Sequence, residues 1–356
     1  MKKTPIKSRV YVCHTYYHVY VSFLKEMYLP QEQRGKADLI LSTMTTSFGN
    51  IKKRIEASSV FHEVIMFDEK RDVHFPELAP YMNMTGNQLK ILLGRIKYTK
   101  LYGKLEEAYI PVDFNEYKDI YVFCDSDPIG FYLNYKKIYY HAVEDGLNTL
   151  KYCDAARYRN QRFFKLKALL SSWNLIFIQN GYGKYCIDME VNDISCLKYK
   201  YKKYVEVPRK NMVDNLSKEQ KQVLLKVFIE DCEELQQLVT QGEAILLLTE
   251  PLCDMVTREK IFRDIVFEYQ EEGTIIIKPH PNDLLDYKII FPENIVIESK
   301  APMEIMNFIS GLVFKKVIAV FTELEGLTFA KEKVRLGSDF MDKYEDPAIH
   351  RYNDNL

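Results

Sequence analysis

A cation and an imidazole stand close together in the segment Lys278-Pro279-His280-Pro281. The segment follows the apolar run TIII, so we expect it at the carboxyl end of a parallel strand, where ligands of α/β sheets bind. The two prolines stiffen the backbone, so His280 loses little conformational entropy on binding. Its ring could donate to a phosphate oxygen, while Lys278 attracts the anion and lowers the pKa of the imidazolium. The segment predicts a site for a phosphate-bearing leaving group; the alternative is a rigid loop whose ring caps a carbonyl.

An acidic pair, Glu144-Asp145-Gly146, closes the apolar run IYYHAV, again where a parallel strand should end. Glycine permits a sharp turn there and the close approach of a ligand. Two adjacent acids repel each other, and partial burial adds to this, so the pKa of one of them should be raised. Either Asp145 or Glu144 could then act as the general base for an acceptor hydroxyl. The alternative is a helix N-cap followed by a turn.

A third acidic segment, Asp125-Ser126-Asp127, follows the apolar run IYVFC. Carboxylates in this D-x-D pattern can hold Mg²⁺ or Mn²⁺ against a diphosphate. Pro128 and Gly130 make an ordinary turn after the strand equally compatible with the sequence. The metal site is therefore an alternative interpretation.

Four further residues have weaker assignments. Glu250 and Asp254 follow the apolar run AILLLT and could contact a nucleotide or act as acid or base, although residues in such positions also cap the next helix. His14 and His141 lie in apolar strand contexts, and we interpret both as core histidines.

The elements that must position these residues are strands and helices in alternation. Short apolar runs such as RVYVCHT, ADLILST, EVIMFD and DIYVFCDSD are separated by helical patterns, and a second such series begins at EAILLLTEP. This alternation is typical of parallel strands joined by crossover helices. We predict two α/β domains, residues 1–175 and 176–336, followed by a tail, residues 337–356, that packs back on the first domain.

Composition narrows the class of protein. The 356 residues include 49 Lys and Arg and 50 Asp and Glu, so the net charge is close to zero. The protein as a whole therefore has no electrostatic attraction for nucleic acid. The seven cysteines include no C-x-x-C pair, which favours reduced thiols over disulfides or structural zinc. The chain begins without a recognisable export signal and contains no apolar run of about 18 residues. We expect a cytoplasmic protein; peripheral attachment to the inner face of the membrane and the oligomeric state are left open.

The order of the two main motifs resembles a known group of enzymes. An acidic pair followed by glycine in the first domain, with His-Pro about 135 residues later in the second, is similar to the bacterial sialyltransferases, including the lipooligosaccharide sialyltransferase and polysialyltransferase families. The similarity covers about residues 9–330. It implies a GT-B fold, with two Rossmann-like domains facing a central cleft. It also implies inverting transfer from CMP-sialic acid to a sugar hydroxyl, such as that of a terminal galactose in a surface or capsular glycan.

The resemblance also assigns residues on the donor side. Glu304, which opens the helical segment APMEIMNFIS, matches the family residue that holds the ribose hydroxyls, and Ser310 ends the same segment as a further candidate. Thr322 matches a hydroxyl residue that binds the phosphate. Phe321 departs from the pattern, since a second serine is common there.

In the mechanism that the resemblance implies, Asp145 takes the acceptor proton while His280, with Lys278 and Pro281, stabilises the departing CMP. No metal or redox cofactor is expected. Thr15 and His18 resemble the start of the lipooligosaccharide enzymes and are candidates for the acceptor side, together with Glu144, Gly146 and Asp125.

Three alternatives stay open at this point. One is a metal-dependent nucleotide-sugar transferase that uses Asp125 and Asp127, and another is a transferase with a CDP-glycerol-type or CMP-Kdo donor. The third is a non-catalytic relative that binds a nucleotide or glycan. The sequence does not choose the acceptor, the linkage or the number of residues added.

Overall fold

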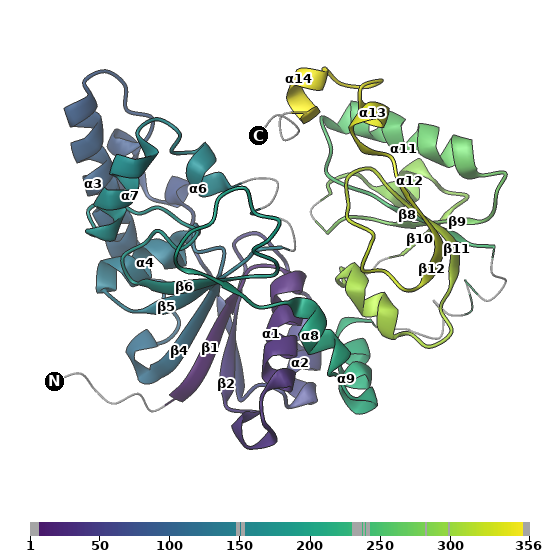
Figure 1. The fold of residues 1–356 in the computed structure, drawn as a ribbon, viewed down its shortest axis with the longest axis horizontal. Helices are drawn as coiled ribbons and strands as arrows, with labels where there is room; N and C mark the ends of the chain where they lie inside the picture. The colour runs from purple at the N-terminus through teal and green to yellow at the C-terminus, as the bar shows by residue number, and fades with distance from the viewer. Residues whose placement is uncertain are drawn as a thin grey trace. The chain divides into compact units, whose positions relative to one another are not determined.

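The computed structural model describes residues 7–146, 150, 154–229, 237, 239, 243–281, 283–297 and 300–351. The chain divides into two compact units, Met1–Leu216 and Ser217–Leu356, each built on its own parallel sheet (Figure 1). This architecture of two Rossmann-like domains is the one that the strand and helix alternation predicts. The central cleft stays a prediction.

The first unit contains a seven-stranded parallel sheet in the order β3-β2-β1-β4-β5-β6-β7. Its central strands are almost continuously apolar because helices cover both faces of a parallel sheet. The chain runs outward from β1 to β3 and then returns to the other side of β1, so the sheet has a topological switch point between β1 and β4. The strands are β1 (Lys7–Cys13), β2 (Ala37–Ser42), β3 (Glu63–Phe67), β4 (Tyr117–Phe123), β5 (Tyr140–Val143), β6 (Cys186–Val191) and β7 (Tyr204–Glu206).

The helices of this unit form two layers. Figure 1 shows α1 and α2 on one face of the sheet and α3, α4 and α7 on the other. This follows from right-handed crossovers that run in opposite directions from the switch point. The helices are α1 (Tyr16–Tyr28), α2 (Ile51–Ser58), α3 (Gln88–Glu106), α4 (Pro128–Lys136), α6 (Ala155–Tyr158), α7 (Phe164–Ser172) and α8 (Arg209–Asp214), with 3-10 turns η1 (Gln31–Gln33), η2 (Asp72–His74), η3 (Pro76–Tyr81) and η4 (Phe114–Glu116).

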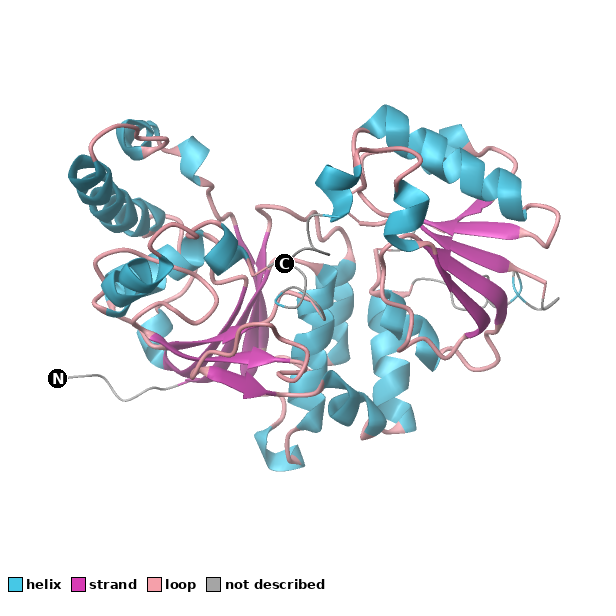
Figure 2. Cartoon of the chain, turned by 45° about the horizontal axis from the view of Figure 1, so that its top comes forward, coloured by secondary structure: helices cyan, strands magenta, loops and turns pink. Residues whose placement is uncertain are grey.

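The second unit has a five-stranded parallel sheet in the order β10-β9-β8-β11-β12, which Figure 2 shows as a separate set of strands. Its core is aliphatic and aromatic, with α11 packed on β8 and β9 through residues such as Ile261 and Phe262. The elements are α9 (Lys218–Phe228), β8 (Ile245–Leu248), α11 (Met255–Tyr269), β9 (Ile275–Lys278), α12 (Tyr287–Ile290), β10 (Ile295–Val296), η5 (Met303–Phe308), β11 (Phe314–Ala319), β12 (Ala330–Arg335), α13 (Gly337–Met341) and α14 (Pro347–His350).

The structure corrects two predicted boundaries. The first unit extends to Leu216, because β6 pairs in parallel with β5, and β7 with β6, to complete the first sheet. The tail is part of the second unit, where the buried side chains of Phe340 and Met341 join the core. Whether the tail also packs on the first domain stays a prediction.

Two further findings concern cysteines and membrane spans. The cysteines that the structure describes are all free thiols: Cys13, Cys124, Cys186, Cys196 and Cys253. Cys153 and Cys232 lie outside the described residues. Throughout the described parts of the chain, no helix combines the length and the apolar character needed to cross a bilayer.

The close approach of α4 to the end of β4 gives a test of this packing. A Cβ atom added to Gly130 would lie 1.9 Å from the carbonyl oxygen of Asp125. Gly130→Ala should therefore lower the free energy of unfolding by about 3 kcal/mol or more, because backbone must move to relieve the overlap. Urea denaturation measures the change. Gly326→Ala is the matched control, since its Cβ would meet no atom within 4 Å; equal effects in both variants would contradict the packing described.

Candidate active site

The carboxyl ends of four strands in the first sheet carry ionisable side chains. His14 follows β1, Glu69 follows β3, Asp127 follows β4 and Asp145 follows β5. Because the strands are parallel, all these ends lie along one edge of the sheet, around the switch point where ligands of such folds bind.

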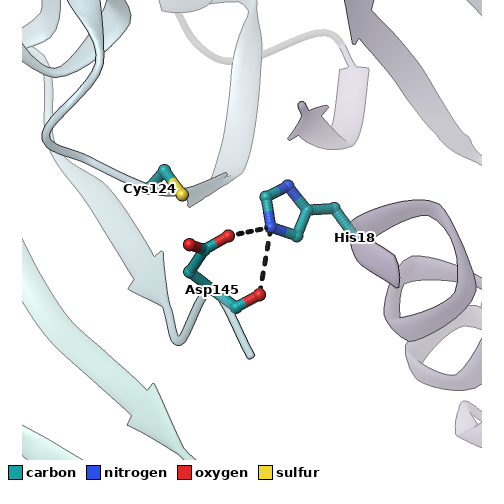
Figure 3. Close-up of side chains that lie close together, drawn as sticks. All are labelled: His18, Cys124 and Asp145. Atoms are coloured by element: carbon teal, nitrogen blue, oxygen red, sulfur yellow. Dashed lines mark hydrogen bonds and ion pairs between the residues drawn. The ribbon is translucent and has the colours of Figure 1, made fainter. Parts of the chain in front are cut away.

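A hydrogen bond between His18 and Asp145 lies at the centre of this edge (Figure 3). The Nδ1 atom of His18 accepts from the backbone N–H of His14 at 3.0 Å, so the ring hydrogen must be on Nε2. Nε2 therefore donates to Oδ1 of Asp145 at 2.5 Å, and its distance to the Asp145 carbonyl oxygen is 3.3 Å. The ring stacks on Phe123 with centroids 4.6 Å apart. These contacts fix both the position and the tautomer of His18.

The two partners of this hydrogen bond differ in exposure and in charge. His18 is fully buried, whereas the side chain of Asp145 is 43% exposed. Burial lowers the pKa of His18 and favours the neutral ring. Burial also acts to raise the pKa of Asp145, but the hydrogen bond from His18 and the nearby charge of His14 outweigh it and lower the pKa to about 2. Asp145 is thus a carboxylate that can meet a ligand from solvent.

Glu144, the other member of the acidic pair, behaves differently. It is buried, and its Oε2 accepts from the backbone N–H of Asn192 at 2.8 Å. Burial raises its pKa to about 7, and the charge of Asp145 adds to the shift. The raised pKa expected for one of the two acids therefore falls on Glu144. Gly146 follows the pair and is half-buried.

Cys124 is the third group in Figure 3. Ligand atoms of His18, Cys124 and Asp145 all lie within 4.8 Å of one another, a nitrogen, sulfur and oxygen set that could hold a metal ion. The hydrogen on Nε2 occupies the lone pair that a metal would need, and burial raises the pKa of the Cys124 thiol well above its usual range. The donor set therefore fits a carboxylate that accepts hydrogen bonds better than it fits a metal.

A buried ion pair lies next to this group. His14 Nε2 is 2.7 Å from Oε2 of Glu69 and 3.5 Å from Oδ2 of Asp127. Glu69 also accepts from the Ser42 hydroxyl at 2.6 Å and from the backbone N–H of Ile129 at 2.8 Å. Burial alone would lower the pKa of His14, but the charge and hydrogen bond of Glu69 prevail and raise it to about 9. A buried imidazolium thus supports the site.

The sequence interpretation missed this ion pair. It placed His14 in the core, which is correct for burial but omits the charge, and it did not select Glu69 at all. Its position in the sequence could have identified Glu69 as a candidate, because it comes two residues after the apolar strand EVIMF and so lies at the carboxyl end of that strand.

The two carboxylates of the D-x-D segment contact different partners. Asp125 is buried, and its carboxylate accepts from the backbone N–H of Asn180 at 2.8 Å and from the Tyr140 hydroxyl at 3.1 Å. Burial raises its pKa to about 6. Asp127 instead lies near His14. Asp125 therefore holds the loop at Asn180 against the sheet, and the different partners of Asp125 and Asp127 disfavour a joint metal site. The predicted place of Asp125 on the ligand side stays a prediction.

Thr15 has a structural contact at this edge. It is the N-cap of α1, and its hydroxyl oxygen accepts from the backbone N–H of His18 at 3.2 Å. The contact helps to set the start of α1 and so the position of the His18 ring. Because the hydroxyl only accepts in this contact, its own O–H could still donate to a ligand, and the predicted acceptor-side role of Thr15 stays a prediction.

In the second unit, the Lys278-Pro279-His280-Pro281 segment begins at the carboxyl end of β9, as predicted. Lys278 is buried; burial lowers its pKa to about 8, while the charge of Glu304 acts in the opposite direction. Burial, and then the charge of Lys278, lower the pKa of His280. The backbone N–H of His280 donates to the Thr249 hydroxyl at 3.0 Å. A neutral imidazole is thus held beside a buried cation.

The other donor-side residues are arranged around Glu250. Its carboxylate accepts from the backbone N–H groups of Phe321 and Thr322 and from the Thr322 hydroxyl at 2.8 Å. The Thr322 hydroxyl has one hydrogen to donate and directs it at Glu250 here, and its predicted role towards a phosphate stays a prediction. Glu250 fixes the loop that follows β11. Asp254 caps α11, the alternative that the sequence left open.

Glu304 and Ser310 lie at either end of the η5 region. Burial raises the pKa of Glu304, and Lys278 opposes the shift. Ser310 and Pro281 are exposed. No described contact tests their predicted roles in donor binding.

Two parallel α/β units with ionisable groups at the carboxyl ends of their strands define a glycosyltransferase fold of the GT-B type. The sequence model of glycosyltransferase family 52 matches residues 63–332, and the chain belongs to this family. The resemblance to bacterial sialyltransferases inferred from the motifs is thereby confirmed at the level of the family.

Two solved structures share the fold over most of the chain. One is an α/β-galactoside α-2,3-sialyltransferase of Photobacterium phosphoreum, 11% identical with a TM-score of 0.54, covering 93% of this chain and 90% of that one. The other is a 2,6-sialyltransferase of Photobacterium sp. JT-ISH-224 in a ternary complex with CMP and lactose, 11% identical with a TM-score of 0.55, covering 93% and 71%.

A sequence relative is an uncharacterized protein of Haemophilus influenzae, 26% identical over 211 residues. The match covers 56% of this chain and 62% of the relative, which is less than two thirds of the relative's length.

The buried pair of His14 and Glu69 predicts a pH-dependent stability. Because folding raises the pKa of His14 from about 6.5 to about 9, its stabilising effect is complete below pH 6.5 and disappears as the pH rises through 9. His14→Gln should remove about 1–3 kcal/mol of this pH-dependent part, as measured by urea denaturation across that range. His74→Gln, at an exposed histidine, is the control. If the free energy of unfolding of His14→Gln had the same pH dependence as that of the wild type, a charged His14 would be excluded.

Proposed function

We propose that this protein transfers a sialic-acid-type sugar from a CMP donor to a sugar hydroxyl, with inversion at the anomeric carbon. The observation that carries the proposal is the half-exposed Asp145 carboxylate, held by a donor from α1 at the ligand-binding edge of a family 52 chain. The acceptor is a terminal galactose of a bacterial surface or capsular glycan. The two Photobacterium enzymes with the same fold act in the same class of reaction, as their descriptions state.

On the acceptor side, Asp145 is the general base. The His18 Nε2–H holds Oδ1, so Oδ2 can accept a hydrogen bond from the sugar hydroxyl. A carboxylate with a low pKa is a weak base towards a neutral alcohol. Proton transfer therefore follows the growth of the new bond between the acceptor oxygen and the anomeric carbon, which makes the hydroxyl more acidic.

On the donor side, His280 and Lys278 stabilise the departing phosphate. As the bond from the anomeric carbon to the phosphate oxygen breaks, both electrons leave with CMP and negative charge develops there. The neutral imidazole offers one N–H donor, and the nearby ammonium group adds a favourable field. Glu304 binds the ribose hydroxyls. None of these steps requires a metal ion.

The decisive experiment uses CMP-sialic acid and a panel of galactose-terminated glycans in the presence of EDTA, with products read by mass spectrometry. We expect sialylated glycan and CMP. Transfer only from CMP-Kdo or CDP-glycerol would move the proposal to another donor. CMP binding without transfer or hydrolysis would indicate a non-catalytic relative, and a requirement for Mn²⁺ would revive the D-x-D site.

Substitutions at the two proposed catalytic residues should separate chemistry from folding. His280→Ala should lower kcat about 10²- to 10³-fold through loss of one electrostatic donor, and Asp145→Asn about 10²- to 10⁴-fold through loss of the base. Circular dichroism should show intact folding. Glu144→Gln is the matched variant for the acidic pair, and a larger loss there than in Asp145→Asn would transfer the role of base to Glu144.

The hydrogen bond from His18 should set the acidic limit of activity. Without this bond, burial would raise the pKa of Asp145 from its present low value, so the carboxylate would become protonated at a higher pH. His18→Phe should shift the acidic limb of the kcat/KM profile to higher pH. His18→Gln keeps an N–H donor and should restore part of the shift. Identical limbs in the wild type and in His18→Phe would contradict the role of His18.

A further inference from the structure

A surface of the first unit, away from the ionisable groups of the candidate site, exposes several large apolar side chains. They lie on α3 and around α7, which share a small core in which Leu92 and Ile96 of α3 pack against the residues buried beneath α7, such as Leu170. Figure 1 shows the two helices as neighbours. We call this the α3–α7 surface and define it by side chains that are 52–65% exposed: Leu89, Leu93, Phe163, Leu166 and Trp173.

These residues are exposed on the two helices or at their ends. Leu89 and Leu93 are four residues apart on α3 and so share one side of that helix, Leu166 lies on α7, and Phe163 and Trp173 flank α7 at its two ends. The inward faces of both helices already pack in the small core. Within the described chain, the exposed face is therefore additional to what the fold needs for its own packing.

The same two segments concentrate positive charge. Residues 88–105 contain five Lys and Arg and no Asp or Glu, and residues 155–175 have the same composition, although the whole chain is balanced. Of the acids that adjoin them, Glu106 is buried and accepts from the Lys70 backbone N–H, and Asp154 pairs with Arg157, which leaves four unneutralised cations in the second segment.

These cations are close enough to interact. Burial lowers the pKa of Lys167, and the charges of Arg95 and Arg162 lower it further. Lys90 and Lys165 are exposed beside the apolar side chains of the α3–α7 surface. The surface therefore combines an apolar centre with a local excess of positive charge.

We propose that the α3–α7 surface binds an anionic phospholipid bilayer. Leucine, phenylalanine and tryptophan side chains at the headgroup boundary bury apolar area, while lysine and arginine on the same helices are attracted to lipid phosphates. Long basic side chains can lay their methylene groups along the apolar surface and keep their charges at the headgroups. The absence of acids from both segments favours a uniformly anionic surface over a protein partner with mixed charge.

The single tryptophan of the chain makes this proposal directly measurable. Trp173 belongs to the α3–α7 surface, so the intrinsic tryptophan fluorescence of the unmodified protein reports on this surface alone. We expect a blue shift on addition of vesicles made of equal parts phosphatidylcholine and phosphatidylglycerol. Pure phosphatidylcholine vesicles should give little shift, and high salt should reverse most of the effect, because the Debye length falls to about 3 Å at 1 M.

Variants can distinguish binding through this surface from nonspecific membrane binding. Each basic residue near an anionic membrane contributes roughly fivefold to partitioning, so Lys90→Glu/Lys165→Glu should weaken vesicle binding roughly 25-fold or more in flotation. Lys260→Glu/Lys331→Glu makes the same charge change at exposed lysines of the second unit and should bind normally. Leu93→Ser/Leu166→Ser should also weaken binding, whereas Val256→Ser/Phe267→Ser, at exposed apolar residues of α11, should not.

Three results would overturn the proposal. The first is the absence of a tryptophan shift with anionic vesicles, and the second is normal binding by the Lys90→Glu/Lys165→Glu variant. The third is a blue shift without vesicles that rises with protein concentration and accompanies dimer formation in sedimentation, which would assign the surface to a second copy of the chain. Transferase activity on a soluble glycan is measured separately, so a failure of lipid binding does not affect the proposed function.

Discussion

The backbone N–H of His14 determines the chemistry of the whole acidic edge. By donating to Nδ1 of His18, it places the ring hydrogen on Nε2, and this hydrogen is directed at Asp145. The resulting bond keeps a partly buried carboxylate ionised and leaves one of its oxygens for a ligand. The end of β1, the first turn of α1 and the loop after β5 must all keep their positions for this bond to exist.

Some of the ionisable groups around this bond are buried and support the structure, whereas others are exposed to solvent. The buried imidazolium of His14 is compensated by Glu69, whose carboxylate is also bonded to Ser42 and to the start of α4. Such a pair stabilises only while every partner is present, because an unpaired buried charge is costly. Asp125 and Glu250 have comparable supporting roles, each tying a loop to a strand end. Glu69, Asp125 and Glu250 thus hold the structure, while Asp145 is held where solvent can reach it.

How far the sequence could predict this arrangement depends on the range of the interactions. Apolar runs that alternate with helical patterns correctly indicated two parallel α/β domains, and the motifs after those runs were correctly placed at strand ends. The domain boundary was wrong because β6 and β7, with sequences such as CIDMEV, are short and partly polar and do not read as sheet strands. The expected raised pKa fell on Glu144, since the partner that lowers the pKa of Asp145 is 127 residues away in the sequence.

What the sequence determined by itself was therefore local: the strands, the helices that follow them, the stiff turn around His280 and the family to which the motifs belong. Tertiary structure alone decided which acids are buried, which of two neighbouring acids has a raised pKa, and that Asp125 and Asp127 take different partners. The physical reason is that backbone preferences act over a few residues, whereas desolvation and hydrogen bonding depend on groups that only the folded chain brings together.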